Sequence, residues 1–299
     1  MIEVKSLLKK FGSAVALNEI SFTIGGGSVF GLVGSNGAGK STLLRTLSGV
    51  YRADGGQAEI DGETPFENSR VKNRLFFISD YPYFFAQASL DDMADFYAGI
   101  YRNWDQKRYL ELCSIFPLGR TSKIINMSKG MQRQAALITA LSTRPDYLFL
   151  DEIFDGLDPV MRQLLKKLLS SEVSERGMTV VIASHNLREL EDLCDHVGLL
   201  HKGGILFERE LDSLKLGIHR VQAILKPMPS PEAFEGLDVI QSKIQGSLVN
   251  LVIRGRRDEI LEKLNRLNPV FIEVLPLTLE EVFISEMEVA GYDIDNILK

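Results

Sequence analysis

Two short stretches of the chain carry residue types that could do phosphate chemistry. Residues 34–42 read GSNGAGKST and fit the pattern G-x-x-x-x-G-K-[ST]. Residues 148–159 read LFLDEIFDGLDP, in which four carboxylates follow an apolar run: Asp151, Glu152, Asp155 and Asp158. The first stretch could surround phosphate oxygens with backbone N–H groups, and the second could hold a metal ion or activate water.

The glycine-rich stretch is predicted to bind a nucleoside triphosphate. Glycines let backbone N–H groups turn inward, and the helix that follows adds its positive end. Lys40 would reach the β- and γ-phosphates, and the Ser41 hydroxyl would ligate Mg²⁺. A plain glycine-rich turn is the alternative, but the strand before it and the helix after it favour the triphosphate. The nucleotide-binding residues predicted here are Gly34, Ser35, Asn36, Gly37, Ala38, Gly39, Lys40, Ser41 and Thr42.

The carboxylate stretch is predicted to complete this site. Asp151 follows the apolar run YLFL, and a carboxylate at a strand end beside such a loop holds Mg²⁺. Glu152 could polarise an attacking water or accept its proton. A solvated strand edge is the ordinary interpretation of an Asp-Glu pair, but downstream of the phosphate loop the functional interpretation is favoured.

The elements that must position these residues alternate between short apolar strands and longer amphipathic helices. This pattern predicts an α/β fold with a mostly parallel central sheet, and residues 2–24 predict an antiparallel edge joined at Gly12. The predicted strands cover residues 29–33, 75–78, 147–150, 180–183 and 197–200. The predicted helices cover residues 41–48, 90–101, 131–141, 160–171 and 187–193, the fourth with Asp158 as N-cap and Pro159 in its first turn.

The sequence texture changes after residue 201. The segment KPMPSP, residues 226–231, is typical of a boundary. Strands are predicted at 221–225, 247–253 and 270–275, and helices at 258–267 and 279–287, which together form a small α+β appendage. We therefore expect a main domain over residues 1–215 and an accessory domain over residues 216–299.

Composition limits the classes of partner. The 299 residues carry a formal net charge of −6, which disfavours coating of nucleic acid. The two cysteines, Cys113 and Cys194, fit small core thiols in a reducing compartment. No secretory signal opens the chain and no apolar run approaches the roughly 18 residues of a spanning helix. We expect a cytoplasmic protein that needs another chain to span any membrane it serves.

Further motifs resemble those of ABC ATPases over residues 1–215. NMSKGMQRQ, residues 126–134, is similar to the LSGGQ signature, with Met127 to Met131 at its five positions. Residues 156–158 resemble the D-loop, VVIASHN at 180–186 resembles the strand and switch histidine, and KKFG at 9–12 resembles the A-loop. The resemblance implies a helical signature subdomain at about residues 80–142, a γ-phosphate contact by His185 and adenine stacking by Phe11. His185 could instead be a helix-entry histidine, and Phe11 could pack on Leu17.

The family implies a head-to-tail dimer that encloses two ATP molecules with Mg²⁺. Ser128, Lys129 and Gly130 of one chain would bind the partner's nucleotide, and Asp155 and Asp158 would lie at the dimer seam. The SKGM segment and the tail PLTLEEVFISEM, residues 276–287, are similar to bacitracin- and multidrug-exporter ATPase subunits, whose membrane domain is a separate polypeptide. This implies a peripheral exporter subunit on the cytoplasmic face of the membrane; homodimer and heterodimer both stay open.

Three departures from the family pattern bear on the site. In the lid segment FISDYP, residues 77–82, Asp80 stands where the family usually has a glutamine, and it could meet Mg²⁺ directly or through water. Lys129 replaces the first signature glycine and could reach the partner's phosphate or face solvent. Ile153 and Phe154 replace Pro-Thr and should change only local packing.

Two alternatives to the transporter subunit remain. One is a soluble ABC ATPase that regulates nucleic acid or ribosomes. The other, motivated by Asp80 and Lys129, is the catalytically weak half of a heterodimeric pair.

Overall fold

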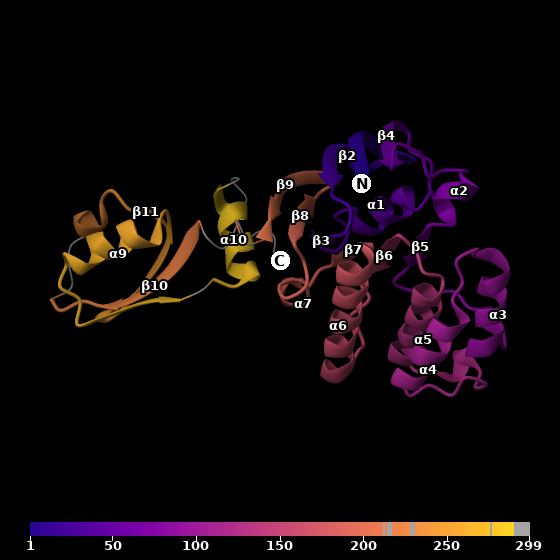
Figure 1. Ribbon diagram of the computed structural model, residues 1–299. Helices are drawn as coiled ribbons and strands as arrows, with labels where there is room; N and C mark the ends of the chain where they lie inside the picture. Colours follow the sequence, from indigo (N-terminus) through magenta and orange to yellow (C-terminus); the bar gives the residue numbers. More distant parts are fainter. Residues whose placement is uncertain (212, 214–216, 228–230, 276, 290–299) are drawn as a thin grey trace. The chain divides into compact units, whose positions relative to one another are not determined.

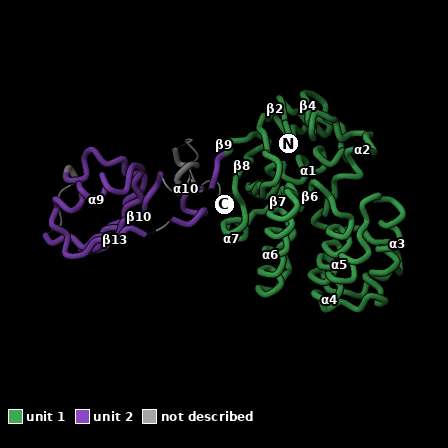
Figure 2. Tube along the Cα trace, viewed as in Figure 1, with its two compact units in different colours: residues 1–208 green, residues 209–299 purple. Residues whose placement is uncertain are grey.

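The structure, a computed structural model, describes residues 1–211, 213, 217–227, 231–275 and 277–289 (Figure 1). Residues 228–230 of the KPMPSP segment and Pro276 of the tail motif lie outside the described residues. The chain divides into two compact units, Met1–Glu208 and Arg209–Lys299, shown in green and purple in Figure 2. Each unit is described by itself. No helix of the described residues is long and apolar enough to cross a bilayer.

A six-stranded sheet with the order β5-β6-β7-β3-β8-β9 forms the centre of the first unit. Adjacent strands from β5 to β8 pair in parallel. Every residue of β3, β6 and β7 is buried, as expected for strands covered on both faces. The predicted parallel strands are confirmed. The bounds of the six strands are β3 Val29–Val33, β5 Leu75–Ile78, β6 Tyr147–Asp151, β7 Thr179–Ser184, β8 His196–His201 and β9 Gly204–Glu210, of which β9 was not predicted.

A three-stranded antiparallel sheet with the order β2-β1-β4 forms the predicted β edge. The strands are β1 Ile2–Phe11, β2 Ala14–Ile24 and β4 Gly55–Ile60. The β1–β2 hairpin turns through Gly12, whose φ of 60° favours glycine. Strand β4 was not predicted, because GGQAEI combines two glycines with few apolar residues. The inner faces of this sheet and of β3, β6 and β7 share one hydrophobic core with α1, Lys40–Leu47.

The helices of the first unit mostly begin where the sequence predicts. Helix α6, Pro159–Arg176, has Asp158 as N-cap and proline in its first turn, as predicted, but it continues beyond residue 171 until Gly177 at φ 67° ends it. The helix at Gln106–Ile115, α4, lies in the predicted helical subdomain but outside the predicted helix ranges, because its segment QKRYLELCSI has only a weak apolar stripe. The remaining helices are α2 Ser69–Lys72, α3 Leu90–Ile100, α5 Lys129–Ser142 and α7 Leu187–Leu190.

Helices α3, α4 and α5 lie side by side in a helical region (Figure 1). A capping box between Ser89 and Asp92 starts α3. The single tryptophan of the chain, Trp104, lies between α3 and α4. Its ring centroid is 5.7 Å from that of the fully buried Tyr109, and its Nε1 donates to Gln106 Oε1 at 2.9 Å. Cys113 of α4 is half-buried, Cys194 is buried, and both are free.

The second unit has its own antiparallel sheet and hydrophobic core. The strand order is β11-β12-β10-β13, and one face of the sheet packs against α9 through Val221, Leu251 and Ile260. The α+β pattern agrees with the sequence except for β11, which was not predicted because most of DVIQSKIQ is exposed and polar. Its elements are β10 Ile218–Ile224, β11 Asp238–Gln245, β12 Leu248–Arg254, α9 Arg257–Asn265, β13 Phe271–Leu275 and α10 Leu279–Val289.

Candidate nucleotide site

The phosphate loop connects the end of β3 to the start of α1 and needs glycine for two different reasons. A Cβ at Gly34 would lie 2.3 Å from the Leu200 carbonyl oxygen, so the backbone must approach β8 without a side chain. Gly37 and Gly39 have φ of 80° and 110°, in the region that favours glycine. The Gly39 position also lies against Ala16 of β2, so the β1–β2 hairpin runs beside the loop.

The structure brings together the three residues predicted to be catalytic. Lys40 Nζ donates to the carbonyl oxygens of Gly34 at 2.6 Å and Ser35 at 3.2 Å, and it lies 3.5 Å from Glu152 Oε1. The other oxygen, Glu152 Oε2, is 2.8 Å from His185 Nδ1 and accepts from the His185 backbone N–H at 3.3 Å. A cation, a carboxylate and an imidazole therefore converge at the carboxyl ends of β3, β6 and β7.

Glu152 has an unusual backbone conformation that its sequence position did not indicate. Its φ is 50°, in the left-handed region that costs a non-glycine residue of order 1–3 kcal/mol. Two hydrogen bonds hold it there: its N–H donates to Ala183 O at 2.9 Å, and its carbonyl accepts from Asp155 N–H at 3.2 Å. The turn directs the Glu152 side chain toward Lys40 and His185, away from the path a continuing strand would give it.

Asp151 lies in the opposite environment. It is 1% exposed, and neither carboxylate oxygen accepts a hydrogen bond from the described residues. Burial raises the pKa of Asp151; the Ser41 side chain and Arg45 partly offset this, whereas the charges of Glu152 and Asp80 add to it. A buried carboxylate without a partner is unfavourable in isolation and suits a cation that arrives with the substrate. The donor set of Asp151 and Ser41 therefore fits Mg²⁺, which prefers oxygen ligands and phosphates.

Asp80, predicted to ligate the metal, makes its described contacts with the signature helix. Its Oδ1 is 2.6 Å from Arg133 Nη2 on α5, in an ion pair that the sequence analysis did not anticipate. Lys129, four residues earlier on the same helix, places Nζ 5.8 Å from the centre of the Tyr81 ring. Asp80 and Arg133 are 53 residues apart along the chain, so no local sequence pattern indicated this ion pair.

The signature segment forms the start of α5. Ser128 is the N-cap, and its Oγ accepts from Met131 N–H at 3.3 Å, which leaves its hydroxyl proton free to donate elsewhere. Gly130 is buried, and a Cβ there would lie 2.6 Å from the Gly156 carbonyl oxygen. The signature helix and the loop after Glu152 are therefore in close backbone contact.

The loop after Glu152 is anchored at both ends. Asp158 Oδ1 accepts from Val160 and Met161 N–H at 2.9 and 3.0 Å, and so caps α6. Ile153 and Phe154 are each 1% exposed and pack in the core, where the sequence analysis expected only local packing.

Phe11 is the last residue of β1 and is 46% exposed. Its ring packs edge-on against Tyr51 at 5.3 Å, and Lys9 Nζ lies 5.3 Å from its centre. A solvent-accessible aromatic at this place is available to stack on a base. Tyr51 was not singled out from the sequence.

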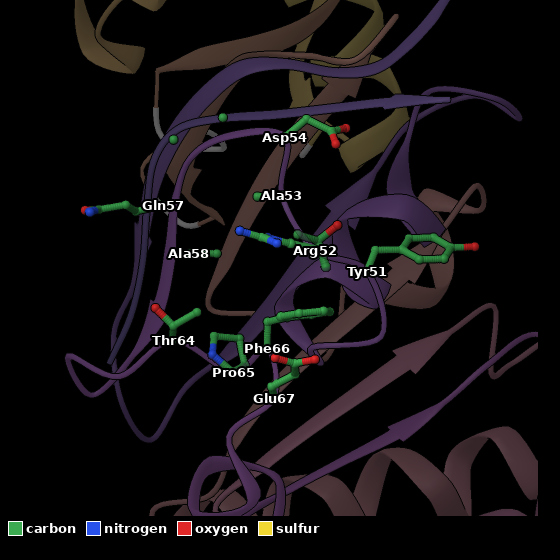
Figure 3. Close-up of a pocket in the computed structure, with 13 residues that line it drawn as sticks. Tyr51, Arg52, Ala53, Asp54, Gln57, Ala58, Thr64, Pro65, Phe66 and Glu67 are labelled. Atoms are coloured by element: carbon green, nitrogen blue, oxygen red, sulfur yellow. The ribbon is translucent and has the colours of Figure 1, made fainter. Parts of the chain in front are cut away.

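A separate cavity of about 510 Å³ lies between β4 and the chain around α1 (Figure 3). None of the predicted site residues lines it, although Tyr51 connects its wall to Phe11. Its labelled side chains include Arg52, Asp54 and Glu67. The predicted site residues gather at the strand ends instead, so this pocket is not part of the candidate nucleotide site.

This arrangement defines a P-loop nucleotide hydrolase: a strand–loop–helix phosphate cradle with an acidic strand end opposite it. Residues 17–155 match the family described as ABC transporter. The chain is 29% identical over 286 residues to the ABC transporter ATP-binding protein YtrB of Bacillus subtilis (strain 168), covering 96% of this chain and 98% of that protein. It is 34% identical over 218 residues to the bacitracin transport ATP-binding protein BcrA of Bacillus licheniformis, covering 72% and 71%.

Among solved structures, an ATP-binding subunit of an ABC transporter superposes with a TM-score of 0.67 at 25% identity, covering 72% of this chain and 92% of that one. The chain therefore belongs to the ATP-binding subunits of ABC transporters. It binds ATP and is an ATPase.

Proposed function

We propose that the protein powers an ABC exporter by hydrolysing Mg-ATP at the cytoplasmic face of a membrane, with the transport path supplied by separate membrane chains. The observation that carries the proposal is the convergence of Lys40, Glu152 and His185 beside the unpaired carboxylate of Asp151. The resemblance to a bacitracin transport subunit and to exporter-type tails supports the direction.

Each residue then has a distinct task. Lys40 exchanges the neutral carbonyls of Gly34 and Ser35 for phosphate oxygens, which are stronger acceptors for an ammonium group. Asp151 and Ser41 would hold Mg²⁺, which supplies charge neutralisation of the phosphates. Asp80 is assigned an indirect role instead of a direct contact with the metal, because its carboxylate already pairs with Arg133.

Glu152 accepts the proton of the attacking water or orients that water. His185 Nδ1 donates to one Glu152 oxygen, and Nε2 would donate to the γ-phosphate when the imidazole carries both ring protons. Phosphoryl transfer of this kind depends mainly on positioning and on stabilisation of charge, so the fixed backbone of Glu152 serves the reaction.

Two copies, or one copy and a related subunit, would close head to tail over two ATP molecules. Ser128 and Gly130 at the start of α5 would donate to the partner's γ-phosphate, where the positive end of the helix adds to the attraction. Asp155, whose side chain is 67% exposed, would lie at the seam. Analytical ultracentrifugation of Glu152→Gln with and without Mg-ATP tests this: dimer formation only with nucleotide is expected.

An exposed aromatic surface next to the lid is the place where we infer that a membrane subunit docks. It consists of Tyr81, Tyr83, Phe85 and Phe96, with Tyr81 and Tyr83 more than 70% exposed at 75% and 77%. The Phe85 and Phe96 ring centroids are 4.7 Å apart, so the lid and α3 form one patch. Contiguous exposed aromatics of this kind mark interaction sites.

The test is a pull-down of tagged Glu152→Gln protein from its native membranes in mild detergent with Mg-ATP, with the bound chains identified by mass spectrometry. Turnover should fall by at least about 10²-fold in this variant while ATP binding is retained. We expect an integral membrane protein to be recovered at near-equal stoichiometry. Adding Tyr83→Ser and Phe96→Ser to the Glu152→Gln protein should abolish that recovery. Glu175→Gln, the same acid-to-amide change at an exposed residue of α6, is the matched control for Glu152→Gln. Recovery of ribosomes or of soluble chains alone would favour a non-transport ATPase.

The catalytically weak half of a heterodimer is the second candidate, favoured by the ion pair that occupies Asp80. Purified protein that hydrolyses ATP at a rate typical of enzymes, about 1 s⁻¹ or faster, would exclude it. Hydrolysis that starts only when a second ATPase subunit is added would establish it.

A further inference from the structure

Arg133 is a buried cation that joins three segments of the first unit. It lies on α5, and its side chain is 5% exposed. Nη2 donates to Asp80 Oδ1 at 2.6 Å and to the Asp80 carbonyl at 3.3 Å. Nη1 donates to the Asp155 carbonyl oxygen and lies 3.5 Å from Asp155 Oδ2. One side chain therefore links the lid, the signature helix and the loop that follows Glu152.

The two acids around Arg133 are not equivalent. The Asp155 carboxylate is 67% exposed, so its charge is well solvated and contributes little to the pair. The Asp80 carboxylate is 32% exposed and is the closer counter-ion at 2.6 Å. Without Asp80 the guanidinium would be a buried charge with an inadequate partner, which is the unfavourable case for a buried ion pair.

The backbone around Arg133 leaves little room for adjustment. A Cβ at Gly156 would lie 3.2 Å from Arg133 Nη1, and one at Gly130 would lie 2.6 Å from the Gly156 carbonyl oxygen. A second contact of the same kind lies one turn earlier, where Lys129 Nζ is 5.8 Å from the centre of the Tyr81 ring. The lid is thus attached to α5 through two consecutive residues, Asp80 and Tyr81.

The Arg133 contacts lead directly to the backbone of Glu152. The Asp155 N–H donates to the Glu152 carbonyl at 3.2 Å, and this bond helps to hold Glu152 at φ 50°. If the Asp155 carbonyl lost its donor, the turn that aims the Glu152 carboxylate would lose one of its anchors. Misplacement of a catalytic group by about 1 Å can cost about 10²-fold in rate.

We propose that Arg133 is a positioning residue for ATP hydrolysis, and that Asp80 acts by holding Arg133 rather than by binding the metal. This inference rests on the proposed role of Glu152 in hydrolysis. It also explains why the lid has an aspartate at position 80: the carboxylate of Asp80 neutralises the buried guanidinium of Arg133.

The experiment compares Asp80→Gln, Arg133→Gln and the double variant in the full-length chain. The measurements are kcat, KM for ATP, the half-saturating Mg²⁺ concentration, and the Mg-ATP-induced rise in Tm, which does not depend on turnover. Each single change should lower kcat about tenfold, with the KM for ATP and the Mg²⁺ dependence of both kcat and Tm unchanged. The double variant should be no slower than the slower single variant, because two amides leave no buried charge unpaired.

Two results would overturn the proposal. One is an additive, about hundredfold, loss of kcat in the double variant, which would make the two residues independent. The other is a tenfold rise in half-saturating Mg²⁺ for Asp80→Gln but not for Arg133→Gln, which would assign Asp80 to the metal. A wild-type protein without ATP turnover would instead count against the proposed function itself.

Arg108→Gln is the matched structural control. Arg108 is an arginine of the same unit, and its Nη2 lies 2.7 Å from the buried carboxylate of Glu172, whose side chain is 4% exposed. Its removal also leaves a buried charge with one partner fewer, so Tm should fall. Its kcat should stay within about twofold of wild type, which separates a positioning effect from a general loss of stability.

Discussion

At the scale of single residues, Asp151 and Glu152 are neighbours with opposite roles because the backbone changes direction between them. Asp151 still follows the β6 strand and points its carboxylate into a buried place without hydrogen-bond partners. Glu152 enters the left-handed region and turns toward Lys40 and His185. In the proposed mechanism, Asp151 is kept available for a cation and Glu152 is fixed to act on water.

The unpaired carboxylate leads to a prediction about stability. Asp151→Asn should raise the Tm of the nucleotide-free protein, measured in EDTA at pH 7–8, because it removes a buried charge that costs about 1–3 kcal/mol. For a chain of this size the rise is about 2–4 °C for each kcal/mol. The same variant should lose the increase in Tm that Mg-ATP gives the wild type. A fall in Tm would contradict this interpretation of the site.

The pH dependence of the Tm gain of Asp151→Asn follows from the direction in which the pKa of Asp151 is shifted. Burial raises the pKa of Asp151 in the folded state above the unfolded value of about 3.9. A carboxyl pKa that is raised by folding means that the folded state favours the protonated form. The contribution of this group to stability is therefore fully present below the unfolded pKa and is lost as pH rises through the folded pKa. The Tm difference between Asp151→Asn and wild type should therefore shrink as pH falls toward 4. Glu175→Asn, an exposed change, should show no such trend.

At the scale of elements, the start of α5 and the loop after β6 must stay in register. Gly130→Ala would force its methyl group against the Gly156 carbonyl oxygen, at 2.6 Å, so the helix or the loop must shift. We expect a fall in kcat of about 10²-fold, although alanine favours helix formation. A coupled assay of ATP turnover measures this.

Gly99→Ala is the internal control for that substitution. Gly99 lies in α3, and nothing lies within 4 Å of the Cβ it would gain. Its stability should rise by up to about 1 kcal/mol through helix propensity, with kcat unchanged. Equal kcat values for the two variants would show that the Gly130 contact is not needed for hydrolysis.

Much of the fold and of the site could be predicted from the sequence. The buried parallel strands are short unbroken apolar runs, and the phosphate loop is fixed by local spacing, so neither depends on distant contacts. Lys40 and Glu152 were predicted from their motifs, and His185 from the family resemblance. In the structure the three meet because the carboxyl ends of the adjacent parallel strands β3, β6 and β7 lie at one edge of the sheet.

The parts that could not be predicted depend on tertiary contacts or on weak local signals. Strand β11 pairs only on one side and stays exposed, so its sequence needs no apolar alternation. Asp80 is 53 residues from Arg133 along the chain, and no local pattern chooses between an ion pair and a metal for its carboxylate. The left-handed conformation of Glu152 is set by Ala183 on the neighbouring strand.

At the scale of the whole molecule, the two units have separate hydrophobic cores. One core joins strands and α1 of the first unit, and the other lies between the four-stranded sheet and α9 of the second. Every residue assigned to the nucleotide site lies in the first unit. The accessory domain over residues 216–299 is therefore proposed to act on regulation or assembly rather than on the chemistry.

A chain ending at residue 215 should fold on its own and bind ATP with an affinity within about threefold of the full chain, because every residue assigned to the nucleotide site lies within residues 1–208. Thermal unfolding and calorimetric titration with Mg-ATP measure the two properties. Aggregation of the shortened chain, or a tenfold weaker affinity, would show that the second unit is needed to form the site.

Trp104, the single tryptophan, gives the helical region an optical reporter of its own. Because its indole packs near Tyr109 and donates to Gln106, its emission depends on how α3 and α4 lie around it. All intrinsic tryptophan fluorescence of the chain comes from this one place. Movements of α3 and α4 during a catalytic cycle can therefore be followed in real time with the unlabelled sequence.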